Sequence, residues 1–278
     1  MAVLLDEPIT FDVGDGPPTH APMALVTIRG TTTRLILDTG STDHILTVEL
    51  AEQLGLEATE GEAGTDSTGS SVPSWSLGEV QAEIAGQTFL LGNVVGIPGP
   101  PPFKKWGIGG IVSPQHLHPS AWAVLDLVGE RLILVDLDET DMSAWLIDRA
   151  PQLQLLRLER VPGDETMLVR ASIEPFEQAV TMLDSGGKGT EMVADLGPGL
   201  AAGPQQVTGH GVGGGEAYGA VVAGRTLLVG DARVSVPRLI LRDEMDGRGI
   251  LVGMDVLRGT VLAVSGDPSR PVFWMVPR

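Results

Sequence analysis

Leu35-Ile36-Leu37-Asp38-Thr39-Gly40-Ser41 is the stretch of this sequence that decides the fold. Its three apolar residues indicate a buried strand, which ends in an acid, a small hydroxyl residue and a glycine. A carboxylate delivered by a buried strand is costly unless it is hydrogen-bonded or used for chemistry. Because a tripeptide alone is a weak motif, the stretch needs a supporting context elsewhere in the chain.

That context is a second copy, Thr181-Met182-Leu183-Asp184-Ser185-Gly186-Gly187, whose acid lies 146 positions after Asp38. A loop of small residues begins 26 positions after the first acid and 25 after the second. Apolar clusters with glycine, Ile108-Gly109-Gly110 and Leu251-Val252-Gly253, end 72 and 69 positions after the two acids. Three landmarks in the same order predict an internal repeat. We therefore expect a duplicated all-β lobe with a pseudo-two-fold axis between the copies.

The composition favours short strands joined by turns. The chain has 278 residues, 42% of them hydrophobic but only 4% aromatic, with 37 glycines and 20 prolines. This length allows one large domain or two lobes of ordinary size. We expect a first lobe over 1–135, a connection over 136–163 and a second lobe over 164–278, with both termini and the connection forming a shared sheet.

Charge and cysteine usage exclude several classes of function. A net charge of −18 repels nucleic acid and anionic membranes. The absence of cysteine excludes disulfides and thiolate chemistry, and no stretch approaches the length of a membrane span. The first residues lack the basic and apolar regions of a signal peptide, so we expect a cytoplasmic protein. A secreted or periplasmic location is the alternative if a leader has been removed.

Local patterns outline further elements. Strands are predicted over 9–13, 24–28 and 34–37, then over 77–84 and 88–95, and a hairpin over 123–127 and 131–135. A short helix is predicted over 47–55, with Thr47 as its cap and Gly55 as its stop. Pro98 to Pro102 is expected to form a rigid spacer.

Two equivalent acids on a pseudo-symmetric axis would meet between the lobes. Like charges a few ångströms apart cannot both ionise easily, so the pair would share a proton. One carboxylate could then deprotonate a water molecule while the other, protonated, polarises a substrate carbonyl.

The two motifs, each with its downstream apolar-glycine cluster, resemble the lobes of pepsin-like and retroviral-type aspartic proteases over roughly 20–135 and 165–276. The resemblance implies that Asp38 and Asp184 carry catalysis without a metal or other cofactor. It also implies that hydroxyls after the acids lock the two loops together and that glycines bring backbone amides to the carboxylates. The supporting residues would be Thr39, Gly40, Ser41, Ser185 and Gly186.

The resemblance further implies a hairpin flap that closes over an extended peptide. The flap candidates are Gly64, Trp75, Gly209, Gly211 and Tyr218. Trp75 and Tyr218 stand near the place of the tyrosine expected on a pepsin-type flap, and ordinary packing is an equal alternative for both. Because both halves have a flap loop, the chain looks more like a retroviral dimer fused into one chain than like pepsin.

One departure from the pattern predicts an asymmetric pair. Gly187 stands where Ser41 stands in the first motif, so Asp184 lacks a hydroxyl that Asp38 could use. Fewer hydrogen bonds to the charged form raise a carboxyl pKa, and we therefore expect Asp184 to hold the shared proton.

Two other motifs have simpler interpretations. Gly209 to Gly214 fits the G-x-G-x-x-G pattern, but no βαβ context surrounds it, so we interpret it as a flap tip. His116 and His118 would need further ligands to bind a metal and are expected to be loop residues. The leading interpretation is a monomeric aspartic endopeptidase acting on peptides or proteins. The alternative is a peptide-binding pseudo-protease of the same fold.

Overall fold

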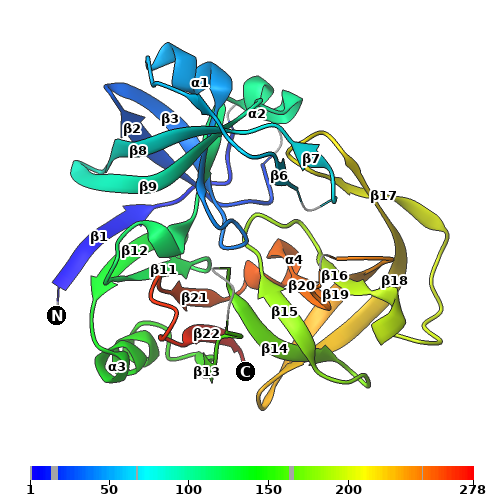
Figure 1. Ribbon diagram of the computed structural model, residues 1–278. Coiled ribbons are helices and arrows are strands. Elements are labelled where there is room, and N and C mark those ends of the chain that lie inside the picture. Colours follow the sequence, from blue (N-terminus) through cyan, green and yellow to red (C-terminus); the bar gives the residue numbers. More distant parts are fainter. Residues whose placement is uncertain (1, 14–17, 67, 163–165, 246) are drawn as a thin grey trace.

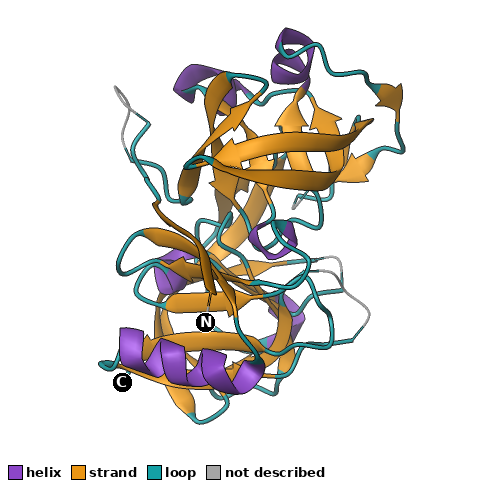
Figure 2. Ribbon diagram, turned by 90° about the vertical axis from the view of Figure 1, so that its left-hand side faces the viewer, coloured by secondary structure: helices purple, strands orange, loops and turns teal. Residues whose placement is uncertain are grey.

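Strands dominate the computed structural model, which describes residues 2–13, 18–66, 68–162, 166–245 and 247–278. Among these residues the chain is all-β with a few short helices, arranged in three larger sheets and one two-stranded sheet (Figures 1 and 2). None of the described helices has the length and hydropathy that crossing a membrane requires.

A seven-stranded sheet forms the first lobe, with strand order β2-β3-β10-β4-β9-β8-β5. The strands are β2 (Met23–Ile28), β3 (Thr31–Leu37), β4 (His44–Thr47), β5 (Thr59–Glu60), β8 (Trp75–Ile84), β9 (Gln87–Ile97) and β10 (Ile108–Val112). The lobe also contains the helices α1 (Val48–Gln53) and α2 (Pro101–Trp106) and the small hairpin of β6 (Gly64–Thr65) and β7 (Ser71–Val72).

The second lobe is a seven-stranded sheet with strand order β14-β15-β20-β16-β19-β18-β17. Its strands are β14 (Leu168–Ile173), β15 (Ala179–Leu183), β16 (Thr190–Val193), β17 (Gln205–His210), β18 (Glu216–Val229), β19 (Ala232–Arg242) and β20 (Ile250–Val252). It also contains a 3-10 turn, η2 (Ala194–Leu196), and the helix α4 (Met254–Leu257).

The two sheets have matching pairings. In the first lobe β10 is parallel to β3 and antiparallel to β4, and β4 is parallel to β9. In the second lobe β20 is parallel to β15 and antiparallel to β16, and β16 is parallel to β19. Each strand that ends in an acid therefore lies beside the same kind of neighbour.

A six-stranded sheet joins both ends of the chain, in the order β1-β12-β11-β21-β22-β13. Its strands are β1 (Ala2–Pro8), β11 (Trp122–Asp126), β12 (Arg131–Asp136), β13 (Leu153–Leu158), β21 (Val261–Val264) and β22 (Val272–Pro277). The 3-10 turn η1 (Pro114–His116) precedes β11, and helix α3 (Glu139–Arg149) packs on the sheet through Met142 and Leu146 (Figure 2). The shared sheet expected from the termini and the connection is therefore present.

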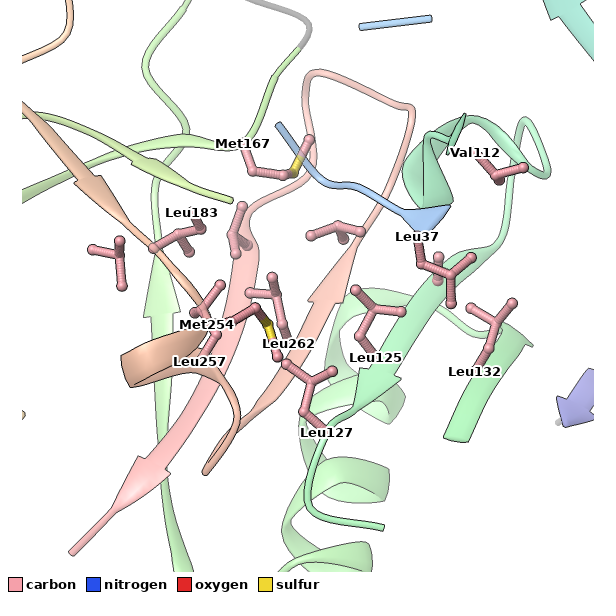
Figure 3. Packing of buried hydrophobic residues seen from close by; sticks show 14 of the residues in the cluster. Leu37, Val112, Leu125, Leu127, Leu132, Met167, Leu183, Met254, Leu257 and Leu262 are labelled. Carbon is pink, nitrogen blue, oxygen red and sulfur yellow. The ribbon is translucent and has the colours of Figure 1, made fainter. Parts of the chain in front are cut away.

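One apolar core runs through all three sheets. Figure 3 shows Leu37 and Val112 of the first lobe near Leu125 of the shared sheet, with Leu183 and Leu262 in the same cluster. Leu37, Leu183 and Leu262 are fully buried. The residues directly before the two acids thus anchor both motif loops in a common core.

Several sequence expectations need correction. Residues 9–13 form only an isolated bridge, Thr10 to Met23, because the Asp12 amide turns back to the Thr10 hydroxyl; the strand lies earlier, as β1. The 98–102 spacer runs into α2, which begins at Pro101. The connection contains α3 and β13, and its boundary at 163–164 lies outside the described residues. Helix α1 and its Thr47 cap are confirmed.

The expected pairing of the two apolar-glycine clusters is also wrong by three residues. Val112 pairs with Leu37 as Val252 pairs with Leu183, so Ser113 occupies the place of Gly253. Gly110 serves another purpose, since a Cβ atom there would overlap the carbonyl oxygen of Ile45 on β4. The glycine therefore allows the close approach of β10 and β4.

We predict that Gly110→Ala destabilises the protein by about 3 kcal/mol, because the clash is with backbone that cannot rotate away. Urea denaturation measures the loss. Gly92→Ala in β9 is the matched control, since a Cβ there meets nothing within 4 Å. Equal stability of the two variants would contradict the close approach.

Candidate active site

The two motif loops leave their strands in the same way. The Asp38 amide donates to the Val112 carbonyl oxygen at 2.9 Å, and the Asp184 amide donates to the Val252 carbonyl oxygen at 3.0 Å. Each loop then folds back on its acid: the Gly40 amide donates to Asp38 Oδ1 and the Gly186 amide to Asp184 Oδ1, both at 2.8 Å.

The folded chain brings the two carboxyl groups together. Asp38 and Asp184 share a side-chain hydrogen bond. A Cβ atom on Gly40 would lie 2.9 Å from the Asp184 carboxyl carbon, and one on Gly186 would overlap the Asp38 carboxyl group. Each glycine therefore faces the acid of the opposite loop, and a side chain at either position would separate the pair.

Reciprocal hydroxyl bonds hold the loops in register. Thr39 Oγ1 donates to the Leu183 carbonyl oxygen at 2.6 Å and accepts the Ser185 amide at 3.1 Å. Ser185 Oγ donates to the Leu37 carbonyl oxygen at 2.7 Å and accepts the Thr39 amide at 3.0 Å. Both hydroxyl residues are fully buried. These bonds cross the lobe boundary where the two strands end.

The closeness of the two carboxyl groups favours a single shared proton. Burial raises the pKa of Asp38 well above its usual range, and the charge of Asp184 adds to the effect. One premise of the expectation that Asp184 holds the proton is wrong, because the Ser41 hydroxyl donates to the Asp43 carbonyl oxygen instead of Asp38. Each acid has two backbone hydrogen bonds, since the Gly187 amide donates to Asp184 at 2.8 Å and the Gly186 amide also bonds to Asp38.

Two hairpin tips meet in the structure. We call residues 66 and 68–70, between β6 and β7, the first tip, and residues 211–215, between β17 and β18, the second tip. The Gly213 amide donates to Asp66 Oδ2 at 2.9 Å. Figure 1 shows β6 and β7 beside the yellow hairpin that carries the second tip.

Glycine in the second tip is required by this contact. A Cβ atom on Gly211 would overlap the Asp66 carboxyl group, and one on Gly215 would overlap the Ser70 hydroxyl. Burial favours the neutral form of Asp66, yet hydrogen bonds from Thr68 and Gly213 outweigh it and lower the pKa of this carboxyl. Asp66 therefore contacts the second tip as a carboxylate.

The flap candidates from the sequence lie at different positions along these hairpins. Gly211 lies in the second tip, and Gly64 and Gly209 lie in the strands that lead to the tips. Trp75 pairs with Glu60 and Gly96 at the start of β8. Tyr218 pairs with Val207 in β18 and is 52% exposed. Neither Trp75 nor Tyr218 is therefore a tip residue, although the Tyr218 hydroxyl donates to the Glu216 carboxylate beside the second tip.

Sequence reasoning missed three polar residues around the motifs. Asp66 lies in a loop without periodicity, where only its acidity among small residues marked it. Gln115, 1% exposed, donates its side-chain amide to the Ser41 carbonyl oxygen at 3.0 Å. His20 Nε2 lies 3.0 Å from the Gly186 carbonyl oxygen. No local pattern could predict the last two contacts, because they depend on how distant segments pack.

Another histidine, His44, is buried after the first motif loop. His44 is 1% exposed, and burial lowers its pKa to about 4. Its Nδ1 accepts the Ser113 amide at 3.3 Å. Among the described residues, no group of three or more His, Cys, Asp or Glu is placed to bind a metal ion.

Comparison with known proteins agrees with this geometry. A family model described as aspartyl protease matches residues 24–94, a segment that includes Asp38, α1 and the first tip. Asp184 lies outside the matched segment. The comparison with curated proteins gave no match. The family match supports a relation to aspartyl proteases and, in general terms, a peptidase.

We predict that Ser185→Ala costs about 2–4 kcal/mol of folding stability, because it leaves the buried Leu37 carbonyl and Thr39 amide without partners. Ser41→Ala, whose hydroxyl bonds within its own loop, should cost about 1 kcal/mol. Chemical denaturation compares them. The bonds between the loops would lose their importance if both variants were equally stable.

We predict that Asp66→Asn frees the second tip, because the amide group cannot accept the Gly213 N–H while serving Thr68. Hydrogen exchange of peptides covering 205–220 should quicken by about tenfold. The lowered pKa of Asp66 sets the direction of the pH dependence. The wild-type contact persists above the usual carboxyl range and is lost as pH falls through the lowered value. Asp231→Asn, in an exposed turn, is the control. Unchanged exchange in Asp66→Asn would rule out the contact.

Proposed function

We propose that the protein is an aspartic endopeptidase that hydrolyses peptide bonds with a water molecule activated between Asp38 and Asp184. The observation that carries the proposal is the hydrogen-bonded pair of carboxyl groups, that of Asp38 half-buried and that of Asp184 buried, contributed by two motif loops of matching geometry. The family match over the first of these loops supports the same conclusion.

We assign the roles from the raised pKa of Asp38, which favours its protonated form. Asp184, as the carboxylate, takes a proton from water as the water oxygen attacks the peptide carbonyl carbon. Asp38 gives its proton to the carbonyl oxygen, which forms a neutral tetrahedral intermediate. In the second step Asp38 takes a proton back from that hydroxyl, Asp184 gives its proton to the amide nitrogen, and the C–N bond breaks. The pair returns to its starting protonation state.

We propose that the hairpins cover this chemistry, which the contact between their tips supports. A peptide between the tips and the motif loops would lie extended, with hairpin backbone available for strand-like hydrogen bonds. Closing the site excludes water and strengthens the electrostatic effects of the pair. Because one chain supplies both acids, we propose that it acts as a monomer.

We further propose that the lobes are pepsin-like or retropepsin-like copies of one unit, related by a pseudo-two-fold axis. The identical strand order of the two sheets supports this relation. The division into 1–135, 136–163 and 164–278 describes the two copies and their connection, with the six-stranded sheet shared by all three segments.

The wild-type protein should cleave a denatured protein or peptide library, and Asp38→Asn or Asp184→Asn should lower cleavage by about 10³-fold or more. Each substitution removes one proton carrier while keeping the side-chain shape. The alkaline limb of the pH–rate profile should lie above the usual carboxyl range, because the raised pKa keeps the proton on Asp38.

Asp231→Asn is the matched control for loss of a carboxylate elsewhere, and circular dichroism checks that each variant folds. Wild type that binds peptides but cleaves none between about pH 3 and 8 would favour the pseudo-protease. Cleavage that survives both substitutions would overturn the proposal.

A further inference from the structure

The strands that carry the two acids have matching faces on the side away from the common core, and each face packs into a smaller apolar cluster. In the first lobe Ile111 pairs with both Ile36 and Ile45. In the second lobe Leu251 pairs with both Met182 and Glu191. The ladders therefore superpose Ile45 on Glu191, and a carboxylate replaces an aliphatic side chain at that position. We call these the first face and the second face.

A second apolar residue of the first lobe is replaced by a charged residue in the second lobe. Thr47 pairs with Ile97 in the first lobe, and the equivalent pair in the second lobe is Val193 with Arg242. Arg242 Nη1 lies 3.3 Å from Glu191 Oε2, and these side chains are only 9% and 18% exposed. Two apolar positions of the first lobe are thus an ion pair in the second.

Stability gives no reason for this pair. Taking two charges out of water costs several kcal/mol per ion, and apolar side chains of similar volume are often as stable or more stable. Burial has the largest effect on Glu191 and raises its pKa. The charges of Arg242 and Arg248 lower this pKa and those of Asp184 and Asp255 raise it, so that the net change is upward. The carboxylate is therefore poorly compensated by its surroundings and has capacity for another hydrogen-bond donor.

The second face adjoins the reacting groups. A Cβ atom on Gly187 would lie 3.1 Å from Leu251 Cδ2 and 2.8 Å from Asp184 Oδ2. Leu251 is the strand partner of Glu191. A peptide side chain beside Asp184 would thus meet Leu251 first and Glu191 on the next strand.

The first face already holds a side chain. Val212 of the second tip packs against the apolar cluster that contains Ile111, as do Ile36 and Ile45. The tip is held there by the hydrogen bond from the Gly213 amide to Asp66. An aliphatic side chain from a turn of the opposite lobe therefore lies against the same cluster as the first face.

We propose that the two faces are side-chain subsites of unlike chemistry. The first takes an apolar side chain of the substrate, which replaces Val212. The second takes an amide or cationic side chain that donates hydrogen bonds to Glu191, held in place by Arg242. The inference rests on the proposed peptidase function and adds the substrate class: peptides with an apolar residue on one side of the cleaved bond and a donor residue on the other.

The test gives the second subsite the residues of the first. Glu191→Ile with Arg242→Ile gives the second lobe the residues of Ile45 and Ile97. Wild type should select glutamine, asparagine, lysine or arginine at one position of cleaved library peptides. The double variant should lose that selection, select apolar residues there, and cleave a lysine-containing peptide about tenfold less well relative to its norleucine analogue.

Glu174→Ile with Arg233→Ile, which removes an exposed ion pair, is the matched control and should keep the wild-type profile. Circular dichroism and thermal unfolding establish that both double variants fold. An unchanged profile in the Glu191 and Arg242 variant overturns the subsites while leaving the peptidase function intact.

A separate readout covers failure of the proposed function. If wild type and Asp38→Asn are equally inactive, fluorescence anisotropy compares binding of the lysine and norleucine peptides to wild type and to the double variant. Loss of lysine preference in the double variant supports the second subsite without any turnover. Equal binding of both peptides to wild type overturns it.

Discussion

Two carboxyl groups held in one hydrogen bond at the lobe boundary set the demands on the surrounding structure. Such a pair resists double ionisation, and burial raises this resistance further. The arrangement survives only if neither loop can withdraw. Thr39 and Ser185 meet this demand, because each hydroxyl satisfies one carbonyl and one amide of the opposite lobe. The same bonds give hydrogen-bond partners to four buried backbone groups that would otherwise lack them.

The position of the loops depends in turn on the common core. Leu37 and Leu183 precede the acids and are fully buried in a cluster that includes strands of the shared sheet. Because the shared sheet draws strands from both ends of the chain, the lobes cannot separate without disrupting it. The fold therefore fixes the distance between the two acids through covalent connection, packing and hydrogen bonds together.

The central site could be predicted from the sequence because its signals are local and occur twice. An apolar run before Asp38 and again before Asp184 indicates two strands, and equal spacing of landmarks indicates equal lobes. The match of Ile108-Gly109-Gly110 to the second lobe failed because most of the spacing difference falls between β9 and β10, where the first lobe has α2. The prediction of a strand over 9–13 was wrong because a side-chain turn at Thr10 competes with strand pairing.

Contacts between distant segments were beyond sequence reasoning. Asp66 and Gly213 lie 147 positions apart, and neither belongs to a periodic stretch. The hydroxyl bond expected from Ser41 to Asp38 was also mispredicted, since the direction taken by this hydroxyl depends on loop geometry. The count of hydroxyl residues near each acid suggested unequal hydrogen bonding, whereas backbone amides bond to both acids.

A single chain with two similar lobes can do what a symmetric dimer cannot. A two-fold dimer presents the same surface twice, so both sides of its site must recognise the same chemistry. When the two lobes are aligned, Ser113 corresponds to Gly253 and Ile45 corresponds to Glu191. These differences lie on the strands around the acids. They do not affect the hydroxyls and glycines that hold the acids. The carboxyl pair therefore requires similar loops at the centre, while covalent linkage frees the flanking faces to differ, and under the proposed function this difference would give a bound peptide one preferred direction.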